Sequence, residues 1–192
     1  MIYFYSDPHF FHDNIIRLGN RPFADREDMH RSLTDRYNAL VTDDDDVYFL
    51  GDLAFNRKKI KTRELKGSMV SSIIRRLGGR KYLVTGNHDD WLMADPSFDR
   101  SVFSWIAPSF EFSSGPWKLL LVHDPADYLH DPETGADPKM ILADDEILIY
   151  GHVHQNTPPD APARSACVCV EQIDYAPISV DSAIDLALGS AG

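Results

Sequence analysis

Residues 2–9 read IYFYSDPH, a short apolar run that ends in an aspartate and a histidine. The run Ile2 to Tyr5 is rich in β-branched and aromatic residues and has the length of a strand. Every position in it is apolar or aromatic, which is typical of a strand buried on both faces. The stretch therefore predicts a central strand with Asp7 and His9 directly beyond its carboxyl end.

The same arrangement recurs four times further along the chain. The other apolar runs are Val47 to Leu50, Tyr82 to Val84, Leu119 to Val122 and Ile147 to Tyr150. The polar residues that follow them are, in the same order, Gly51-Asp52, Gly86-Asn87-His88-Asp89, His123, and Gly151-His152-Val153-His154. Ligands bind beyond the carboxyl ends of strands in α/β folds, so these groups are expected around one crevice. The glycines are expected to let the backbone turn sharply after each strand.

The rest of the chain supplies helices and a hairpin. Apolar residues recur at helical spacing over Asp25 to Val41 and Leu65 to Leu77, which predicts parallel β-α-β units in the first half. In the second half, residues 113–116 (SSGP) predict a hairpin turn between Phe110 to Phe112 and Trp117 to Val122. A further strand is expected over Cys167 to Ile173, and a last helix over Asp181 to Leu188.

The composition fits one globular domain over residues 1–192, because 43% of the residues are hydrophobic and 26% are charged. No apolar run reaches the roughly 20 residues of a membrane helix. The first residues also lack the basic segment of a signal peptide. We therefore expect no membrane partner and a cytoplasmic location, while the oligomeric state does not follow from the sequence.

The charge is unevenly distributed. A net charge of −11 argues against a general nucleic-acid coat protein. Yet ten of the 19 Lys and Arg residues lie between Arg57 and Lys81, with Glu64 as the only acid there. This basic segment is either a solvated helix face or a patch that holds an extended polyanion.

Some potential ligands are assigned to structural roles. Cys167 and Cys169 are too few for a disulfide framework or a structural zinc site, so reduced thiols are expected. His30 and His130 are isolated histidines and are also expected to be structural.

The polar groups after the five strands form a set of metal ligands. Imidazole and carboxylate together suit zinc, manganese, iron and related divalent ions. The set holds more donors than one tetrahedral site needs, which indicates a first shell for two ions. A carboxylate such as Asp52 can bridge two ions at the spacing of about 3.5–4 Å typical of two-metal hydrolysis.

These blocks, in this order, resemble the signature of the calcineurin-like metallophosphoesterases. The blocks are D-x-H, G-D, G-N-H-D, H and G-H-x-H, and they run from Asp7 to His154. The opening Ser6 to Ile16, with Arg21-Pro22-Phe23, also resembles a subgroup of small bacterial and phage members. The resemblance implies an α/β fold in which two mixed β-sheets form a sandwich flanked by helices.

The resemblance also implies roles for individual residues. The first metal would be held by Asp7, His9, Asp52 and His154, and the second by Asp52, Asn87, His123 and His152. His88 would face the leaving group as general acid or hold the phosphate, with Asp89 fixing its ring. Two divalent ions are implied, with Mn²⁺ as first choice and Fe, Zn or Ni as alternatives.

Three further residues are candidates for contact with substrate. His12 lies three residues beyond His9 and otherwise has a structural role. Asn14 otherwise caps a helix that starts near Ile15. Arg21 pairs with phosphate or is a surface charge.

The expected activity is hydrolysis of a phosphate ester, a mono- or diester, by water or hydroxide that bridges two divalent ions. The first alternative is a nuclease or cyclic-nucleotide phosphodiesterase, with a nucleotide or nucleic acid as partner. A more distant alternative is a non-catalytic interaction module on the same fold.

Overall fold

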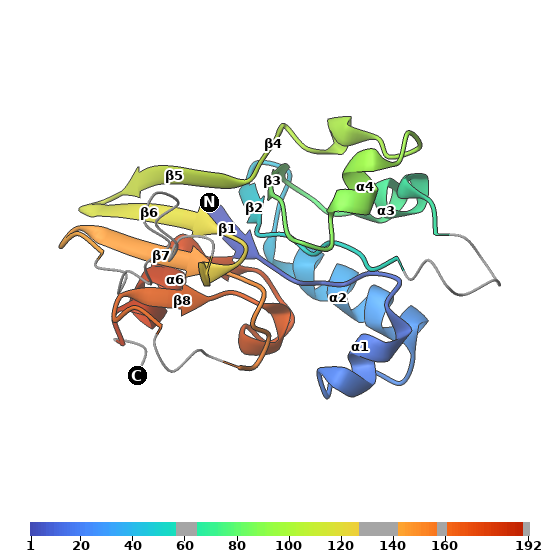
Figure 1. The fold of residues 1–192 in the computed structure, drawn as a ribbon, viewed down its shortest axis with the longest axis horizontal. Coiled ribbons are helices and arrows are strands. Elements are labelled where there is room, and N and C mark those ends of the chain that lie inside the picture. The colour runs from blue at the N-terminus through green and yellow to red at the C-terminus, as the bar shows by residue number, and fades with distance from the viewer. Residues whose placement is uncertain (57–64, 127–141, 157–160, 190–192) are drawn as a thin grey trace.

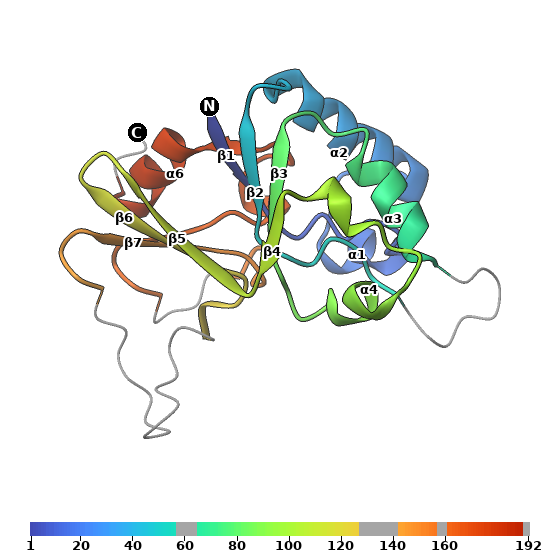
Figure 2. The same cartoon turned by 90° about the horizontal axis from the view of Figure 1, so that it is seen from above.

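The computed structural model describes residues 1–56, 65–126, 142–156 and 161–189. The chain forms two mixed β-sheets (Figures 1 and 2). The first sheet has the order β4-β3-β2-β1-β9, from β4 (Trp105–Ala107), β3 (Arg80–Val84), β2 (Asp46–Phe49), β1 (Ile2–Tyr5) and β9 (Ile178–Ser179). The second has the order β5-β6-β7-β8, from β5 (Ser109–Ser114), β6 (Trp117–Val122), β7 (Glu146–Tyr150) and β8 (Ser165–Cys167). Only β9 and β5 run antiparallel to their neighbours in these sheets.

Helices flank the two sheets. Those beside the first sheet are α1 (Asp13–Leu18), α2 (Arg26–Leu40), α3 (Gly67–Ile74) and α4 (Asp90–Ala94) (Figure 2). The last helix, α6 (Val180–Ala187), contacts strands of both sheets. Two single-turn 3₁₀ helices cover Arg100–Val102 and Val170–Gln172. The expected sandwich of two mixed sheets with flanking helices is confirmed.

The apolar runs are continuous because alternate residues face different layers. In β1, Tyr3 and Tyr5 pack in the core shared with α2 and α3, whereas Phe4 packs in the core between the two sheets. In β6, Leu119 and Leu121 belong to the core between the sheets, and Leu120 to a third cluster on the other face. A strand with both faces covered cannot carry the polar alternation of a half-exposed strand.

The ends of the helices follow from local chemistry. Asp25 caps α2 by accepting a hydrogen bond from the Asp28 backbone N–H at 2.8 Å, so the predicted start is confirmed. The predicted hairpin is also present, with β5 and β6 paired around Gly115. The predicted helix over Leu65 to Leu77 is shorter, since α3 covers Gly67–Ile74.

The strand predicted over Cys167 to Ile173 is wrong in its extent. The strand β8 ends at Cys167, and the chain then crosses to the end of β1. There Val168 accepts a hydrogen bond from the Ser6 N–H at 3.1 Å, and the Val170 N–H donates to the Ser6 carbonyl at 3.0 Å. The following 3₁₀ turn places Glu171 beneath the strand ends, a position that a continued strand would not reach.

Several features of the sequence fall partly outside the described residues. The residues outside the described ranges include 57–64 of the basic segment, His130, and the stretches 127–141 and 157–160. In the described part of the basic segment, Arg75 pairs with Asp99 and Arg80 with Asp46. No helix in the described ranges is long and apolar enough to cross a membrane.

Candidate metal centre

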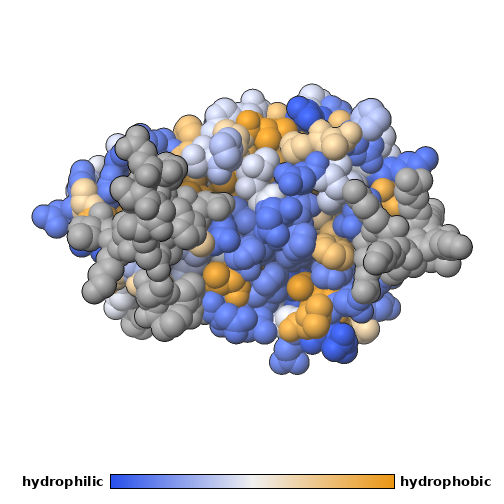
Figure 3. All heavy atoms as spheres, in the orientation of Figure 1, coloured by the Kyte–Doolittle hydropathy of each residue, from blue (hydrophilic) through white to orange (hydrophobic). Residues whose placement is uncertain are grey.

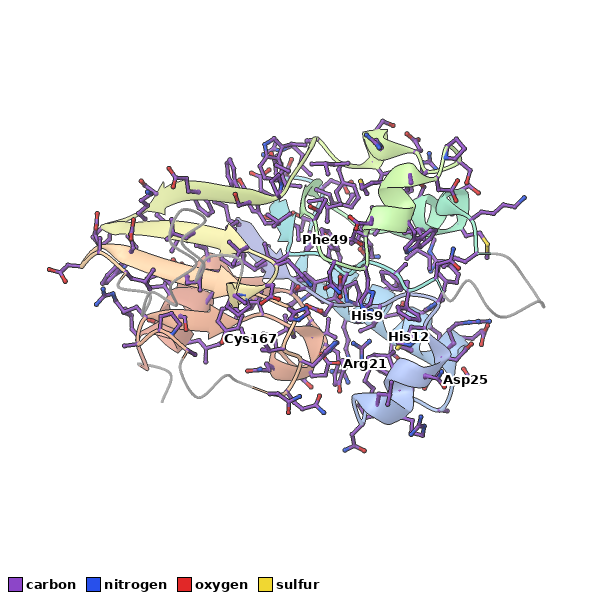
Figure 4. All side chains as sticks on the ribbon, viewed as in Figure 1. His9, His12, Arg21, Asp25, Phe49 and Cys167 are labelled. Atoms are coloured by element: carbon purple, nitrogen blue, oxygen red, sulfur yellow. The ribbon has the colours of Figure 1, made fainter. Side chains whose placement is uncertain are left out.

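The strand ends bring two groups of donors together at one edge of the sandwich. Asp7, His9 and His154 each offer one atom within 4.8 Å of the others, and so do Asp52, His123 and His152. Asn87 joins the second group, because its Oδ1 lies 3.0 Å from His123 Nε2 and 3.1 Å from His152 Nδ1. Figure 4 labels His9 near the middle of the molecule, and in the same orientation hydrophilic residues gather over the middle of the surface in Figure 3.

Asp52 lies between the two groups. Its Oδ2 is 3.5 Å from His9 Nε2, and its Oδ1 is 3.4 Å from His123 Nε2. The carboxylate is almost fully buried, and it presents one oxygen to each group. This is the arrangement required of a carboxylate that bridges two cations.

The unpaired buried atoms fit a cation better than they fit a protein interior. Asp7 Oδ2 accepts hydrogen bonds from Ser6 Oγ at 2.6 Å and the His152 N–H at 2.9 Å. In contrast, Asp7 Oδ1 and both ring nitrogens of His9 are buried without a hydrogen-bond partner among the described residues. Buried polar atoms are rarely left unpaired, and a ligand set of oxygen and imidazole nitrogen suits divalent transition metals.

Three histidines follow strands of the second sheet, and each has an oxygen atom beside one of its two ring nitrogens. His123 Nδ1 lies 2.7 Å from the Leu50 carbonyl oxygen, and His154 Nδ1 lies 2.9 Å from Glu171 Oε1. His152 is reversed: its Nδ1 faces the donor group, and its Nε2 is 3.4 Å from Asp124 Oδ2. An oxygen behind one ring nitrogen fixes the proton there and leaves the other nitrogen for a metal.

The backbone of the site is strained at the ligands. Asp7, His9, Asp52, His152 and His154 all have positive φ, between 49° and 71°. Non-glycine residues are uncommon in this region, and each costs of order 1–3 kcal/mol when the surroundings impose it. Such residues gather at functional sites, so their presence at five predicted ligands supports the assignment.

The glycines after the strands have two different roles. Gly51 has φ +90°, as expected for a sharp turn. Gly86 and Gly151 are not among the residues with positive φ, so their backbone conformation does not by itself require glycine. A Cβ on Gly86 would lie 2.4 Å from Asp52 Oδ1, and one on Gly151 would lie 2.6 Å from Asp7 Oδ2. Their missing side chains make room for the carboxylates.

Protonation of the site follows from its mutual contacts. Burial opposes ionisation of Asp7, but the imidazole of His9, whose Nε2 lies 3.7 Å from Asp7 Oδ1, and the nearby His123 and His154 hold the pKa of Asp7 well below the ordinary value. Burial also opposes protonation of His123, yet Asp7 and Asp52 raise its pKa. These contacts favour a charged Asp7 and a protonated His123, and a cation that binds the deprotonated imidazole would do so with release of a proton.

Arg21 and Glu171 form a buried ion pair beneath the first donor group. Arg21 Nη2 donates to Glu171 Oε1 at 2.8 Å and to the Asp7 carbonyl at 2.8 Å, and its Nη1 donates to the Pro8 carbonyl at 2.8 Å. The Arg21 side chain has no exposed surface. It is therefore not the surface charge considered above, and its donors are engaged with the loop that presents Asp7 and His9 rather than directed to solvent (Figure 4).

Glu171→Gln is expected to weaken metal binding by about 10-fold, at the low end of the effect of removing a carboxylate behind a histidine ligand. The amide retains an oxygen for His154 but loses the charge that makes the imidazole more basic and balances Arg21. The dissociation constant for Mn²⁺, measured by competition with a chelator, tests this. Glu111→Gln, at an exposed acid paired with Lys118, is the control and should leave the constant unchanged.

Asp89 has a different contact from the expected one to the His88 ring. Its Oδ2 accepts hydrogen bonds from the Gly86 and Asp52 N–H groups at 2.8 and 3.0 Å, and its Oδ1 accepts one from the Leu53 N–H at 3.0 Å. The carboxylate thus ties the turn after β2 to the turn after β3. His88 is instead linked through its backbone N–H, which donates to Asp52 Oδ1 at 2.9 Å.

The remaining candidates lie on the rim. The ring of His12 is stacked on Phe55, with centroids 4.1 Å apart, and meets His9 edge-on at 5.6 Å. Asn14 is exposed in the first turn of α1, and the residue at the N-cap position is His12, without a side-chain hydrogen bond. The capping role considered for Asn14 is therefore absent.

Sequence reasoning missed Glu171, Asp124 and the thiol of Cys169. Cys169 is free and buried, and its Sγ lies 3.2 Å from Asp7 Oδ2. Asp124 directly follows His123, so its position after β6 was a usable signal. No local pattern marks Glu171, which contacts Arg21 across 150 residues of sequence.

Comparisons with known proteins agree with this geometry. A model of the calcineurin-like phosphoesterase family matches residues 1–156. An uncharacterised protein of Methanocaldococcus jannaschii is 34% identical over 191 residues, which cover 96% of this chain and 90% of that protein. The gene 66 protein of Mycobacterium phage L5 is 27% identical over 165 residues, which cover 79% of this chain and 76% of that protein.

A solved structure supports the fold over nearly the whole chain. The crystal structure of a protein of unknown function from Aquifex aeolicus superposes with a TM-score of 0.65 at 28% identity, covering 95% of this chain and 96% of the other. The matched family model spans all five blocks of candidate ligands. The chain therefore belongs to the calcineurin-like phosphoesterase family.

Proposed function

We propose that this protein hydrolyses a phosphate ester with water activated between two divalent cations. The observation that carries the proposal is the position of Asp52, with one carboxylate oxygen beside each group of donors. Asp7, His9 and His154 would complete one cation site, and Asn87, His123 and His152 the other. Bound there, two cations supply a water of lowered pKa and neutralise the charge of the phosphoryl oxygens.

In this proposal, His88 acts on the leaving oxygen. Its ring is partly exposed, with 39% of the side-chain surface accessible, and its Nε2 lies 4.0 Å from Asp52 Oδ2. It is thus close to the reacting centre without belonging to either donor group. A protonated His88 would donate to the departing oxygen, and the same N–H would hold the phosphate beforehand.

Three cations of the basic segment are less available to a polynucleotide than the sequence alone suggests. The nuclease alternative rests on the basic segment, and Arg75 and Arg80 within it are engaged with Asp99 and Asp46. Lys81 Nζ donates to the carbonyls of Leu77 and Gly79 at 2.6 and 2.7 Å. The side chains of these three residues therefore already have partners among the described residues and offer less attraction to a phosphate backbone than free cations would.

The test is a metal titration beside an activity screen. The protein, stripped with a chelator, is loaded with Mn²⁺, Fe²⁺, Zn²⁺ or Ni²⁺, and bound metal is counted while a chromogenic phosphate monoester and diester are hydrolysed. Two ions per chain with ester hydrolysis support the proposal, and Mn²⁺ is the expected best metal. Tight metal binding without hydrolysis of any ester would point to the non-catalytic module.

His88→Ala is expected to lower kcat by about 10²- to 10⁴-fold, the usual contribution of a positioned acid. The metal content should stay at the wild-type value, because His88 lies outside both donor groups. Metal analysis and steady-state kinetics on the same preparation measure both quantities. The loss of kcat should be smaller for an ester with a nitrophenol leaving group than for an alkyl ester, because nitrophenolate departs without receiving a proton.

A further inference from the structure

A pocket of about 340 Å³ lies beside the metal centre, on the side of α4. Its lining includes Phe55, Asn56, Asn87, His88, Asp90 and Trp91. Asn87 belongs to the second donor group and His88 faces Asp52, so the pocket shares a wall with the reacting centre. An ester held at that centre would therefore have one of its organic groups next to this pocket.

The two aromatic residues of the pocket are fixed in position. The ring of Phe55 is stacked on His12 at 4.1 Å and meets His88 edge-on at 4.9 Å. The indole N–H of Trp91 donates to the Ala54 carbonyl at 3.3 Å. Rings that are already ordered lose little entropy when a ligand stacks on them, so they are suited to bind a planar group.

Apart from His88, the polar residues that the structure describes in the pocket are neutral or acidic. They are two amides, Asn56 and Asn87, and the exposed carboxylate of Asp90. No Lys or Arg is among the lining residues in the described part of the chain. Aromatic surface with a few amide and carboxylate groups suits a neutral ring that both donates and accepts hydrogen bonds. The volume is at the lower end for ligand sites, enough for one ring system rather than for several nucleotides.

We propose that this pocket binds the heteroaromatic ring of the substrate, and that the substrate class is nucleoside phosphates. The inference rests on the proposed function and adds the identity of the organic group. Phe55 and Trp91 supply the stacking surface, while Asn56 and Asp90 meet the polar edge of the base. His88, at the boundary, stands between the ring and the phosphoryl group.

The experiment compares esters that differ only in the ring. Adenosine 5′-monophosphate is paired with ribose 5-phosphate, and the methyl diester of each is paired in the same way, all with Mn²⁺. Within each pair the bonds to phosphorus are identical. The ratio of kcat/KM for the adenosine ester to kcat/KM for the ribose ester therefore reports the contribution of the base. Base–aromatic stacking accounts for about 5- to 150-fold in binding, and a ratio of about 10 or more is expected in the wild type.

Substitutions of the two aromatic residues test whether the base binds in this pocket. Trp91→Ala and Phe55→Leu should each lower the ratio several-fold, whereas Trp91→Phe, which keeps an aromatic ring, should retain most of it. The ratio is taken within one preparation, so a fraction of unfolded protein does not change it.

The outcomes separate the two proposals. Hydrolysis of both members of a pair at equal kcat/KM overturns the nucleoside assignment and leaves the phosphoesterase function standing. A wild-type ratio that persists in both Trp91→Ala and Phe55→Leu overturns the placement of the ring in this pocket. Failure to hydrolyse these esters and the chromogenic ones alike overturns the proposed function together with this inference.

Discussion

Asp52→Asn is expected to reduce kcat/KM by about 10³-fold or more, because several kcal/mol of barrier lowering depends on the cations. The amide oxygen can still accept the His88 N–H now bound to Oδ1. The NH₂ group then replaces Oδ2, the oxygen beside His9, and an amide NH₂ cannot bind a cation. Metal counting should show loss of at least one ion per chain, and kinetics with added Mn²⁺ measures the loss of rate.

The matched control for this change is Asp44→Asn. Asp44 is exposed in the turn before β2, so this variant loses the same charge without touching the site. It should keep wild-type metal content and rate. Full hydrolysis by metal-free Asp52→Asn would refute the two-cation scheme.

Asp89→Asn is expected to destabilise the fold by about 2–4 kcal/mol, which is about 5–15 °C in melting temperature for a chain of this size. The carboxylate accepts three backbone N–H groups in a fully buried position. An amide offers one oxygen, so one N–H group, such as that of Leu53, is left facing another N–H. Burial raises the pKa of Asp89 to about 7, so the stronger hydrogen bonds to a charged acceptor are lost in addition only above that pH.

Thermal and urea unfolding of the stripped protein measure the effect of Asp89→Asn without a contribution from bound metal. Asp44→Asn again serves as the control and should stay within about 0.5 kcal/mol of the wild type. An unchanged melting temperature for Asp89→Asn would mean that the carboxylate does not fasten the two turns together.

The strands and the grouping of the candidate ligands were predictable because both depend on local sequence. The run Ile2 to Tyr5 is covered on both faces, so it reads as strand without knowledge of its neighbours. Asp25 caps its own helix three residues away, which fixes the start of α2. Parallel strands then bring their carboxyl ends to one edge, and the polar residues after them arrive together without further information.

The supports of the site were not predictable, since they depend on contacts made only in the folded chain. Arg21 reads as a surface charge or phosphate ligand, but Glu171, 150 positions later in the chain, lies beside it. The strand expected through Cys167 to Ile173 instead leaves its sheet, because Ser6 at the end of β1 supplies the next backbone partners. Asp89 follows His88 in sequence, yet its oxygens are taken by backbone N–H groups from two turns.

The candidate ligands come from both sheets, which couples metal binding to the contact between the sheets. Asp7, His9, Asp52 and Asn87 extend from the first sheet, whereas His123, His152 and His154 extend from the second, and each donor group draws on both. A bound ion would thus add a link between two layers that already meet at this rim through the Ser6–Cys169 bridge, the hydrogen bond from the His152 N–H to Asp7 Oδ2 and the contact of His123 Nδ1 with the Leu50 carbonyl. Because a cation would bind only while the two layers stay together, the free energy needed to separate them at this rim would rise with the concentration of free metal.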